Sequence, residues 1–336
     1  MDKEEKFAQT SQTPDSPTSA PTETLIRNSF SIGLQTPILD NYTFQQCVDF
    51  AAQHRFKGGL EVAAWPPGQK PVRRYSGVSH IDSLKVVDPQ NGPAYVEEIL
   101  AYAAEKNVAL SSLLFCGNPL GNADDAEWLQ TVIQAAAILG IRVVTCFVGR
   151  VKTMNVDESF ELFKAKFAPI IQTAEKCGVN IATENCPMYF DANQWPGGEN
   201  LMSSPTNFAR AFEIFDSPNF GLCYDPSHSV LGQFDGIAPI YNFDTKIFCC
   251  HAKDLKLHRD KLSRCGIFAY PLDFVSPCLP PFGDVNWKAF FNALHDINFK
   301  GNVALEFEDR RFENDDNVTV NALLTAKRYL EQFAIA

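Results

Sequence analysis

Short apolar runs alternate with amphipathic segments along most of this chain. Apolar side chains at positions 44, 47, 48, 51 and 52, for example, recur with the spacing of one helix face. The apolar runs predict eight strands, at residues 25–32, 59–64, 109–115, 142–147, 180–184, 220–224, 247–251 and 302–306. Helices are predicted between and after them, at 44–52, 96–106, 128–139, 159–177, 205–215, 237–241, 287–294 and 318–333.

The predicted strands are continuously apolar rather than alternating, which is typical of a parallel sheet covered by helices on both faces. Eight strand–helix pairs at this chain length predict an α/β fold of the closed (β/α)8 type, a TIM barrel. A doubly wound open sheet is the alternative. That fold favours a GxGxxG turn after the first strand, and the residues from Ile32 onward, Ile-Gly-Leu-Gln, do not match it.

The first part of the chain has a different composition. Residues 1–23 are rich in Ser, Thr, Pro and acidic side chains and nearly lack large apolar ones. Such a segment cannot bury enough apolar surface to fold, so it predicts a disordered tail. A single barrel domain is expected over residues 24–336.

Charge and cysteine usage limit the partners and the compartment. The net charge of −11 disfavours binding to nucleic acid or to an anionic membrane, since both need a basic face. No apolar run approaches the ~20 residues of a membrane span. Of the ten cysteines, Cys146, Cys223, Cys249 and Cys250 lie inside apolar runs, where free cysteine acts as a small hydrophobe. A reduced, cytoplasmic location is expected. Assembly into a homo-oligomer is a further possibility.

Polar side chains end four of the later predicted strands: Glu184, Asp225, His251 and Glu306. Because the C-terminal ends of parallel barrel strands meet at one mouth, these side chains are expected to converge. Their oxygen-rich set suits Mn²⁺, Mg²⁺ or Co²⁺ better than a thiol-preferring metal, with Zn²⁺ as a further candidate. Glu308, on the same face of its strand, is the alternative to Glu306.

Three further side chains are candidates for the same site. His228 follows Asp225 by three residues, and its alternative is an ordinary surface histidine. Glu61 lies between apolar neighbours in the second predicted strand and could instead pair with an arginine inside the barrel. His80 belongs to a loop over residues 65–93, and a loop of that length in a compact domain is usually functional.

Several motifs together resemble those of a known family. The chain is similar to the sugar isomerase/epimerase branch of the xylose isomerase-like TIM barrels, which also includes AP endonuclease relatives. The resemblance covers roughly residues 25–333, and its motifs identify the superfamily better than the substrate. It rests on Thr183-Glu-Asn-Cys-Pro187, Tyr224-Asp-Pro-Ser-His228, His251-Ala-Lys-Asp254, Gly283-Asp-Val-Asn-Trp287 and Leu305-Glu-Phe-Glu-Asp309, with Gly59-Leu-Glu-Val-Ala63, Trp65-Pro-Pro67 and Gly77-Val-Ser-His80 in its early part.

The resemblance implies one divalent metal ion, with Mn²⁺ as the first choice and Mg²⁺, Co²⁺ or Zn²⁺ as alternatives. Its ligands would be Glu184, Asp225, His251 and Glu306. The resemblance further implies that Glu184 and Glu306 serve as acid and base on opposite faces of a keto-sugar or keto-polyol.

The same resemblance implies that His228 contacts a substrate hydroxyl, and Glu61 and His80 are candidates for substrate contact. Epimerases of the family often place an arginine a few residues after the metal-binding histidine. That stretch here reads Leu-Lys-Leu-His at residues 255–258, which departs from the pattern. Lys253 or Arg259 could take that arginine's place, and we take Lys253 as the substrate-binding candidate.

Four functions are compared on these residues. The first is an isomerase or epimerase that transfers a proton α to a carbonyl through a metal-bound enediolate. The second is a lyase that cleaves 3-keto-glycosides by β-elimination from the same enolate. An AP-endonuclease-like nuclease would need more strand-end histidines than His228 and His251. A non-catalytic sugar-binding protein would not need two opposed glutamates.

Overall fold

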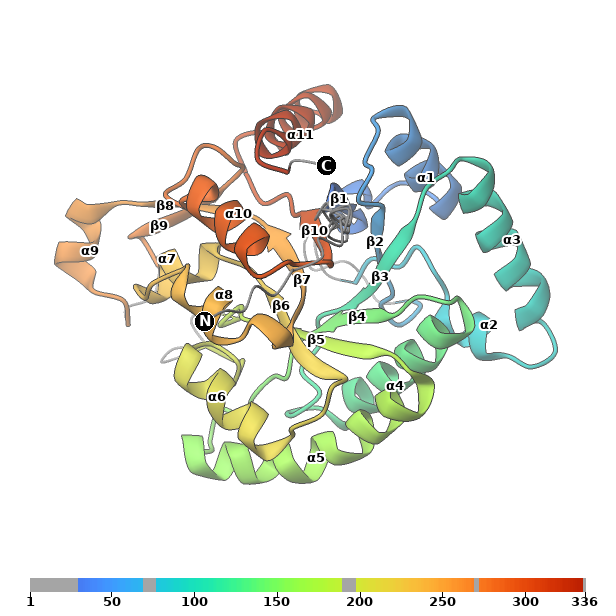
Figure 1. The fold of residues 1–336 in the computed structure, drawn as a ribbon, viewed down its shortest axis with the longest axis horizontal. Helices are drawn as coiled ribbons and strands as arrows, with labels where there is room; N and C mark the ends of the chain where they lie inside the picture. The colour runs from blue at the N-terminus through green and yellow to red at the C-terminus, as the bar shows by residue number, and fades with distance from the viewer. Residues whose placement is uncertain (1–29, 69–76, 189–197, 269–271, 335–336) are drawn as a thin grey trace, which may run out of the picture.

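The centre of the computed structural model is a closed barrel of parallel strands (Figure 1). The structure describes residues 30–68, 77–188, 198–268 and 272–334. Neighbouring barrel strands pair in parallel all the way round, which confirms the predicted (β/α)8 barrel. In order around the barrel the strands are β1 (Ile32–Gln35), β10 (Asn302–Leu305), β7 (Ile247–Ala252), β6 (Phe220–Tyr224), β5 (Asn180–Glu184), β4 (Val143–Cys146), β3 (Leu110–Phe115) and β2 (Leu60–Ala63).

Helices surround the barrel and connect its strands (Figure 1). The longer ones are α1 (Phe44–Gln53), α3 (Gly92–Glu105), α4 (Ala123–Ile138), α5 (Val156–Cys177), α6 (Pro205–Ile214), α10 (Trp287–Asp296) and α11 (Asp316–Glu331). Short helices fill the connections: η1 (Thr36–Leu39), α2 (Ser83–Val87), α7 (Ser227–Gly232), α8 (Ala238–Asn242), η3 (Asp244–Lys246) and α9 (Arg259–Cys265). Among the described residues, no helix has both the length and the apolar character that a membrane crossing requires.

The first strand lies further along the chain than the apolar pattern predicts. β1 covers Ile32–Gln35, whereas the prediction was residues 25–32, of which 25–29 lie outside the described residues and 30–31 are not strand. The prediction was wrong because the last residue of a barrel strand faces the polar mouth, so the polar Gln35 still belongs to the strand. Phe30, counted as strand, instead packs against Phe291 and Phe299. The predicted tail at 1–23 lies outside the described residues.

Helix ends fix where β5 begins, and hence where Glu184 points. Asn155 and Glu158 form a reciprocal capping box at the start of α5. Gly178 ends the helix in the left-handed conformation, with φ of 65°, which glycine adopts without steric cost. β5 starts two residues later, and five residues of strand then bring Glu184 to the mouth of the barrel.

Aromatic side chains form much of the layer between the barrel and α5. The ring of Phe163 lies 4.8 Å from that of Phe167, 5.2 Å from that of Phe215 and 5.8 Å from that of Phe220. Tilted and edge-on ring pairs at such distances stabilise a core beyond their burial alone. This layer anchors β5 and β6, the two strands that carry Glu184 and Asp225.

The segment after β7 leaves the barrel and returns. β8 (Asp254–Leu257) and β9 (Val275–Cys278) pair antiparallel, with α9 between them, and together they project from the left of Figure 1. No strand or helix was predicted between residues 251 and 287, because the pattern of so short a hairpin is too weak to recognise from sequence. Asp254, fully buried, accepts hydrogen bonds from the backbone N–H groups of Gly283 and Val285 and from Trp287 Nε1, at 2.9–3.2 Å.

Replacing Asp254 with alanine is expected to destabilise the protein by about 3–5 kcal/mol, because several buried donors lose their acceptor at once. Asn at this position keeps one acceptor oxygen and should lose less. Urea denaturation of both variants measures the effect. An Asp254→Ala variant as stable as the wild type would contradict this assignment.

Candidate metal centre and acid–base site

Four side chains at the C-terminal ends of β5, β6, β7 and β10 converge inside the barrel mouth. They are Glu184, Asp225, His251 and Glu306, and all four are buried. His251 Nδ1 lies 3.6 Å from Glu184 Oε2 and 3.5 Å from Glu306 Oε2. The convergence expected from the strand ends is therefore present, with the two glutamates facing one ring nitrogen.

Glu61, on β2, lies behind His251 rather than at the open mouth. Its Oε1 is 2.7 Å from His251 Nε2, and its Oε2 accepts hydrogen bonds from Ser112 at 2.7 Å and Thr145 at 2.8 Å. Glu61 has no exposed surface, and none of the arginines in the described part of the chain pairs with it. A carboxylate on the far nitrogen of a ligating histidine fixes the ring and its tautomer. We infer that Glu61 positions His251, which differs from the direct substrate contact expected from the sequence.

Gln35, at the end of β1, is a site residue that sequence reasoning missed. Its Nε2 lies 3.0 Å from His251 Nε2 and 3.3 Å from His251 Nδ1, so it also restrains the ring. The signal that could have found it is its position directly after an apolar run. That run was placed too early in the chain, so Gln35 fell outside the predicted strand.

Lys253 lies among the carboxylates. Its Nζ is 3.0 Å from Glu306 Oε1, 3.3 Å from Asp225 Oδ2, 3.8 Å from Glu308 Oε2 and 3.9 Å from Glu184 Oε1. Only a few per cent of the side chain is exposed. Its ammonium group therefore supplies the positive charge that these buried acids need in the metal-free protein.

His228 is buried, not an ordinary surface histidine. Its Nε2 lies 3.1 Å from Glu184 Oε1 and 3.2 Å from Asp225 Oδ2. Asn185 links the same two strand ends, because its side chain donates to the backbone oxygen of Asp225 and accepts from the backbone nitrogen of Asp225. The imidazole and these two carboxylates therefore form one connected unit.

Burial and ion pairs separate the pKa values of the two glutamates. Burial opposes ionisation of Glu184, but the charges of His251 and Lys253 outweigh it and hold the pKa of Glu184 well below its usual value. Burial raises the pKa of Glu306 to about 8, against the opposing charge of Lys253. The surroundings thus shift the pKa values of the two glutamates in opposite directions, which suits opposite roles in proton transfer.

His80 and Glu308, the two remaining candidates from the sequence, lie outside the cluster of Glu184, His251 and Glu306. His80 is buried, and its Nε2 bonds to the backbone oxygen of Leu39 in η1, so the structure ties it to the first connection of the barrel. Glu308 is more exposed than Glu306, and Glu306, not Glu308, groups with Glu184 and His251. The structure therefore places Glu306, rather than Glu308, beside Glu184 and His251.

The donor set fits a divalent cation. Ligand atoms of Glu184, His251 and Glu306 lie within 4.8 Å of one another. Glu306 Oε2 is buried and accepts no hydrogen bond, a costly state that a cation would relieve. Three carboxylates and one imidazole are the hard, oxygen-rich ligands that Mn²⁺, Mg²⁺ and Co²⁺ accept.

Glu61→Gln is expected to weaken Mn²⁺ binding about 10–100-fold, because a partner of a ligating histidine contributes about that much. Glutamine keeps the shape but loses the charge that orients His251. Isothermal titration with Mn²⁺ measures the affinity, and Glu213→Gln at the opposite end of the barrel is the control. Unchanged affinity in Glu61→Gln would show that His251 holds its orientation without it.

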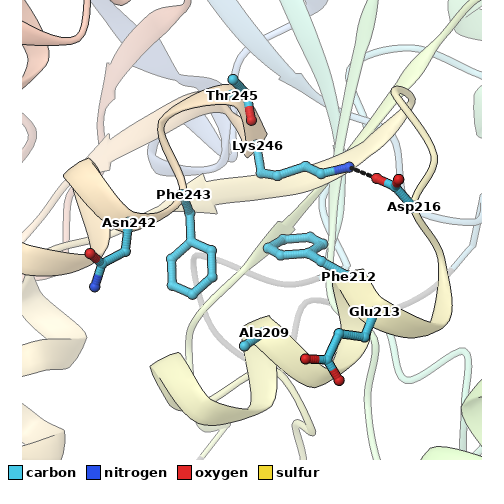
Figure 2. Close-up of a pocket in the computed structure, with 8 residues that line it drawn as sticks. All are labelled: Ala209, Phe212, Glu213, Asp216, Asn242, Phe243, Thr245 and Lys246. Atoms are coloured by element: carbon cyan, nitrogen blue, oxygen red, sulfur yellow. Dashed lines mark hydrogen bonds and ion pairs between the residues drawn. The ribbon is translucent and has the colours of Figure 1, made fainter.

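A shallow pocket lies away from this centre, at the N-terminal ends of β6 and β7. It is lined by α6 and the segment that leads into β7 (Figure 2). Lys246 pairs with Asp216 at 3.4 Å, and its ammonium lies 5.5 Å from the centre of the Phe212 ring (Figure 2). Because Lys246 is already paired with Asp216, which is largely exposed, and the buried acids lie at the other end of the barrel, this pocket is not the candidate site.

Comparisons with known proteins concern the family and the fold. A model of the xylose isomerase-like TIM barrel family matches residues 74–328. No curated protein sequence matches the chain significantly. The fold is similar to that of 3-keto-D-glucoside 4-epimerase from E. coli (TM-score 0.63, 12% identity, 90% of this chain and 99% of that one covered).

Two other solved structures are similar at the level of the fold. One is D-psicose 3-epimerase from Clostridium cellulolyticum H10 (TM-score 0.65, 12% identity, 91% and 100% covered). Another is D-allulose 3-epimerase from Methylomonas sp. (TM-score 0.61, 15% identity, 91% and 98% covered). The matches span nearly the whole length of each of these proteins.

Proposed function

Because this chain belongs to the xylose isomerase-like TIM barrel family, we propose that it is a divalent-metal-dependent isomerase or epimerase. Its substrate is a keto-sugar or keto-polyol, and its reaction is proton transfer at the carbon α to the carbonyl. The three similar structures named above, a 3-keto-D-glucoside 4-epimerase, a D-psicose 3-epimerase and a D-allulose 3-epimerase, support this substrate class. The location we propose is the cytoplasm.

One observation carries the proposal. Glu184 and Glu306 come from different strands, β5 and β10, yet both lie about 3.5 Å from His251 Nδ1. A sugar in the mouth beside this nitrogen would therefore meet one carboxylate from each direction. Transfer of a proton from one face of a carbon to the other needs such a pair, whereas binding alone does not.

The residues divide the work as follows. Glu184, Asp225, His251 and Glu306 would hold the cation, which when bound supplies Lewis acidity toward the carbonyl oxygen. One glutamate takes the proton from the α carbon, which leaves an enediolate, and the other returns a proton from the opposite side or to the neighbouring carbon.

The groups around the two glutamates set their orientation and charge. His228 Nε2 lies within hydrogen-bond distance of Glu184 Oε1 and so holds this carboxylate. The same imidazole ring is presented to a substrate hydroxyl. Lys253 neutralises the carboxylates while the sugar enters and donates to a sugar oxygen afterwards. Burial of these groups excludes water, which strengthens each electrostatic contact.

The test is incubation of the Mn²⁺-loaded protein in D₂O with free ketoses, keto-polyols and 3-keto-glycosides. The expected result is deuterium at one carbon of one substrate, together with an epimer or an isomer. Release of an aglycone with an enone would instead identify a lyase that eliminates from the same enolate. Absence of exchange with every substrate, combined with cleavage of abasic DNA, would overturn the proposal in favour of a nuclease.

A further inference from the structure

The end of β5 carries a second group of metal-ligating side chains beside the first. Ligand atoms of Glu184, Cys186 and His228 lie within 4.8 Å of one another, and all three residues are buried. The proposed proton transfer has no use for a thiol. The trio is therefore a feature of this chain that the reaction leaves unexplained.

Glu184 faces both groups, each with a different oxygen. Its Oε2 lies 3.6 Å from His251 Nδ1, in the first centre, and its Oε1 lies 3.1 Å from His228 Nε2, in the second. A carboxylate with its two oxygens turned to neighbouring ligand sets can bridge two cations. Such paired cations lie about 3.5–4 Å apart in two-metal sites.

Contacts within the protein already hold the side chains of the second group in place without a bound ion. Only 6% of His228 is exposed, and its Nδ1 has no hydrogen-bond partner. The backbone N–H of Met188 donates to Cys186 Sγ at 3.4 Å, a kind of bond that supports metal-bound sulfur. Asn200 Nδ2 holds the backbone oxygens of Glu184 and Cys186 at 3.0 and 2.7 Å, so their spacing is fixed.

From these contacts we infer that Glu184, Cys186 and His228 form a second cation site that takes a thiolate-binding divalent ion such as Zn²⁺. The three residues offer one sulfur, one nitrogen and one oxygen ligand, which is the mixed set that zinc accepts and Mn²⁺ does not favour. On binding, Zn²⁺ displaces the thiol proton of Cys186 to solvent.

A consequence follows that rests on the proposed function. If the second site held Zn²⁺ while the first held its cation, both oxygens of Glu184 would be engaged, and Glu184 would have none free to take a proton. Zn²⁺ at the second site therefore inhibits the Mn²⁺-loaded enzyme. Because the site itself is defined by ligation, its existence can be tested apart from any activity.

The test uses Co²⁺ as a spectroscopic probe on the reduced, metal-free full-length protein. Thiolate ligation gives a sulfur-to-cobalt charge-transfer band, which the oxygen-rich first centre cannot produce. The band is expected in the wild type and in Cys116→Ser, since Cys116 packs in the same small apolar cluster as Cys186 but lies outside the trio. It is expected to be lost in Cys186→Ser. Absence from the wild type, or persistence in Cys186→Ser, would overturn the site.

Two further measurements test the second cation site independently of the cobalt spectrum. If Cys186→Ser does not fold, equilibrium dialysis of the wild type against Mn²⁺ and Zn²⁺ together decides, with two ions per chain expected and one ion refuting the second site. Zn²⁺ should inhibit exchange by the wild type and not by a folded Cys186→Ser variant. A cobalt–thiolate band in a protein that exchanges no keto-sugar proton would uphold the second site and reject the proposed function.

Discussion

Replacing Glu306 with glutamine is expected to slow deuterium exchange into the keto-sugar by ~10²–10⁴-fold, the usual contribution of a general acid or base. Glutamine preserves the shape and one acceptor oxygen, but it cannot carry a proton between carbon and solvent. Glu306 is also an expected metal ligand, so Mn²⁺ content must be measured beside the rate. Slow exchange with Mn²⁺ retained identifies the proton-transfer role.

Glu308→Gln is the matched control for that experiment. Glu308 lies two residues on, 3.8 Å from the same lysine ammonium, and it is more exposed. Its variant should exchange at close to the wild-type rate and keep its metal. The opposite ranking of the two variants would show that Glu308 takes the role assigned to Glu306.

Chelation of the divalent ion is expected to abolish exchange while the barrel stays folded. Activity should vanish because the bound cation is the Lewis acid expected to polarise the carbonyl, and Mn²⁺ should restore it. The fold should persist because Lys253 pairs with Asp225 and Glu306 in the metal-free state. Mn²⁺ at 100 times its dissociation constant should then add about 2.7 kcal/mol to the stability.

Elemental analysis, exchange rates and melting temperatures on the same samples check this expectation. Asp225→Ala should lose Mn²⁺ binding, whereas Asp216→Ala, an exposed aspartate by the pocket in Figure 2, should not. Full exchange by a protein shown to be metal-free would sink the metal-dependent mechanism.

The strand ends could be predicted because their signal is local. The apolar runs that precede Glu184 and Asp225 are buried strands in the structure, as predicted. Because the strands of a parallel barrel end at one face, these two side chains then lie at the same mouth. The position of β1 was harder, because Gln35 ends its strand with a polar side chain that interrupts the apolar pattern.

The supporting contacts could not be predicted because they join distant parts of the chain. Glu61 and His251 are separated by 190 residues, and Gln35 and His251 by 216. No spacing rule connects such pairs, since closure of the barrel alone brings β1 and β2 near β7. The cluster of carboxylates around Lys253 arises in the same way, from three different segments.

The reactivity of the cysteine thiols can report where the barrel unfolds locally. All ten lie among the described residues and are unpaired, and only Cys116, Cys177 and Cys265 have appreciable exposure. Burial raises the pKa of Cys223 and Cys250 well above the usual value, so their thiols react only after exposure to solvent. A time course of thiol alkylation would therefore report which strands separate first, without any added label.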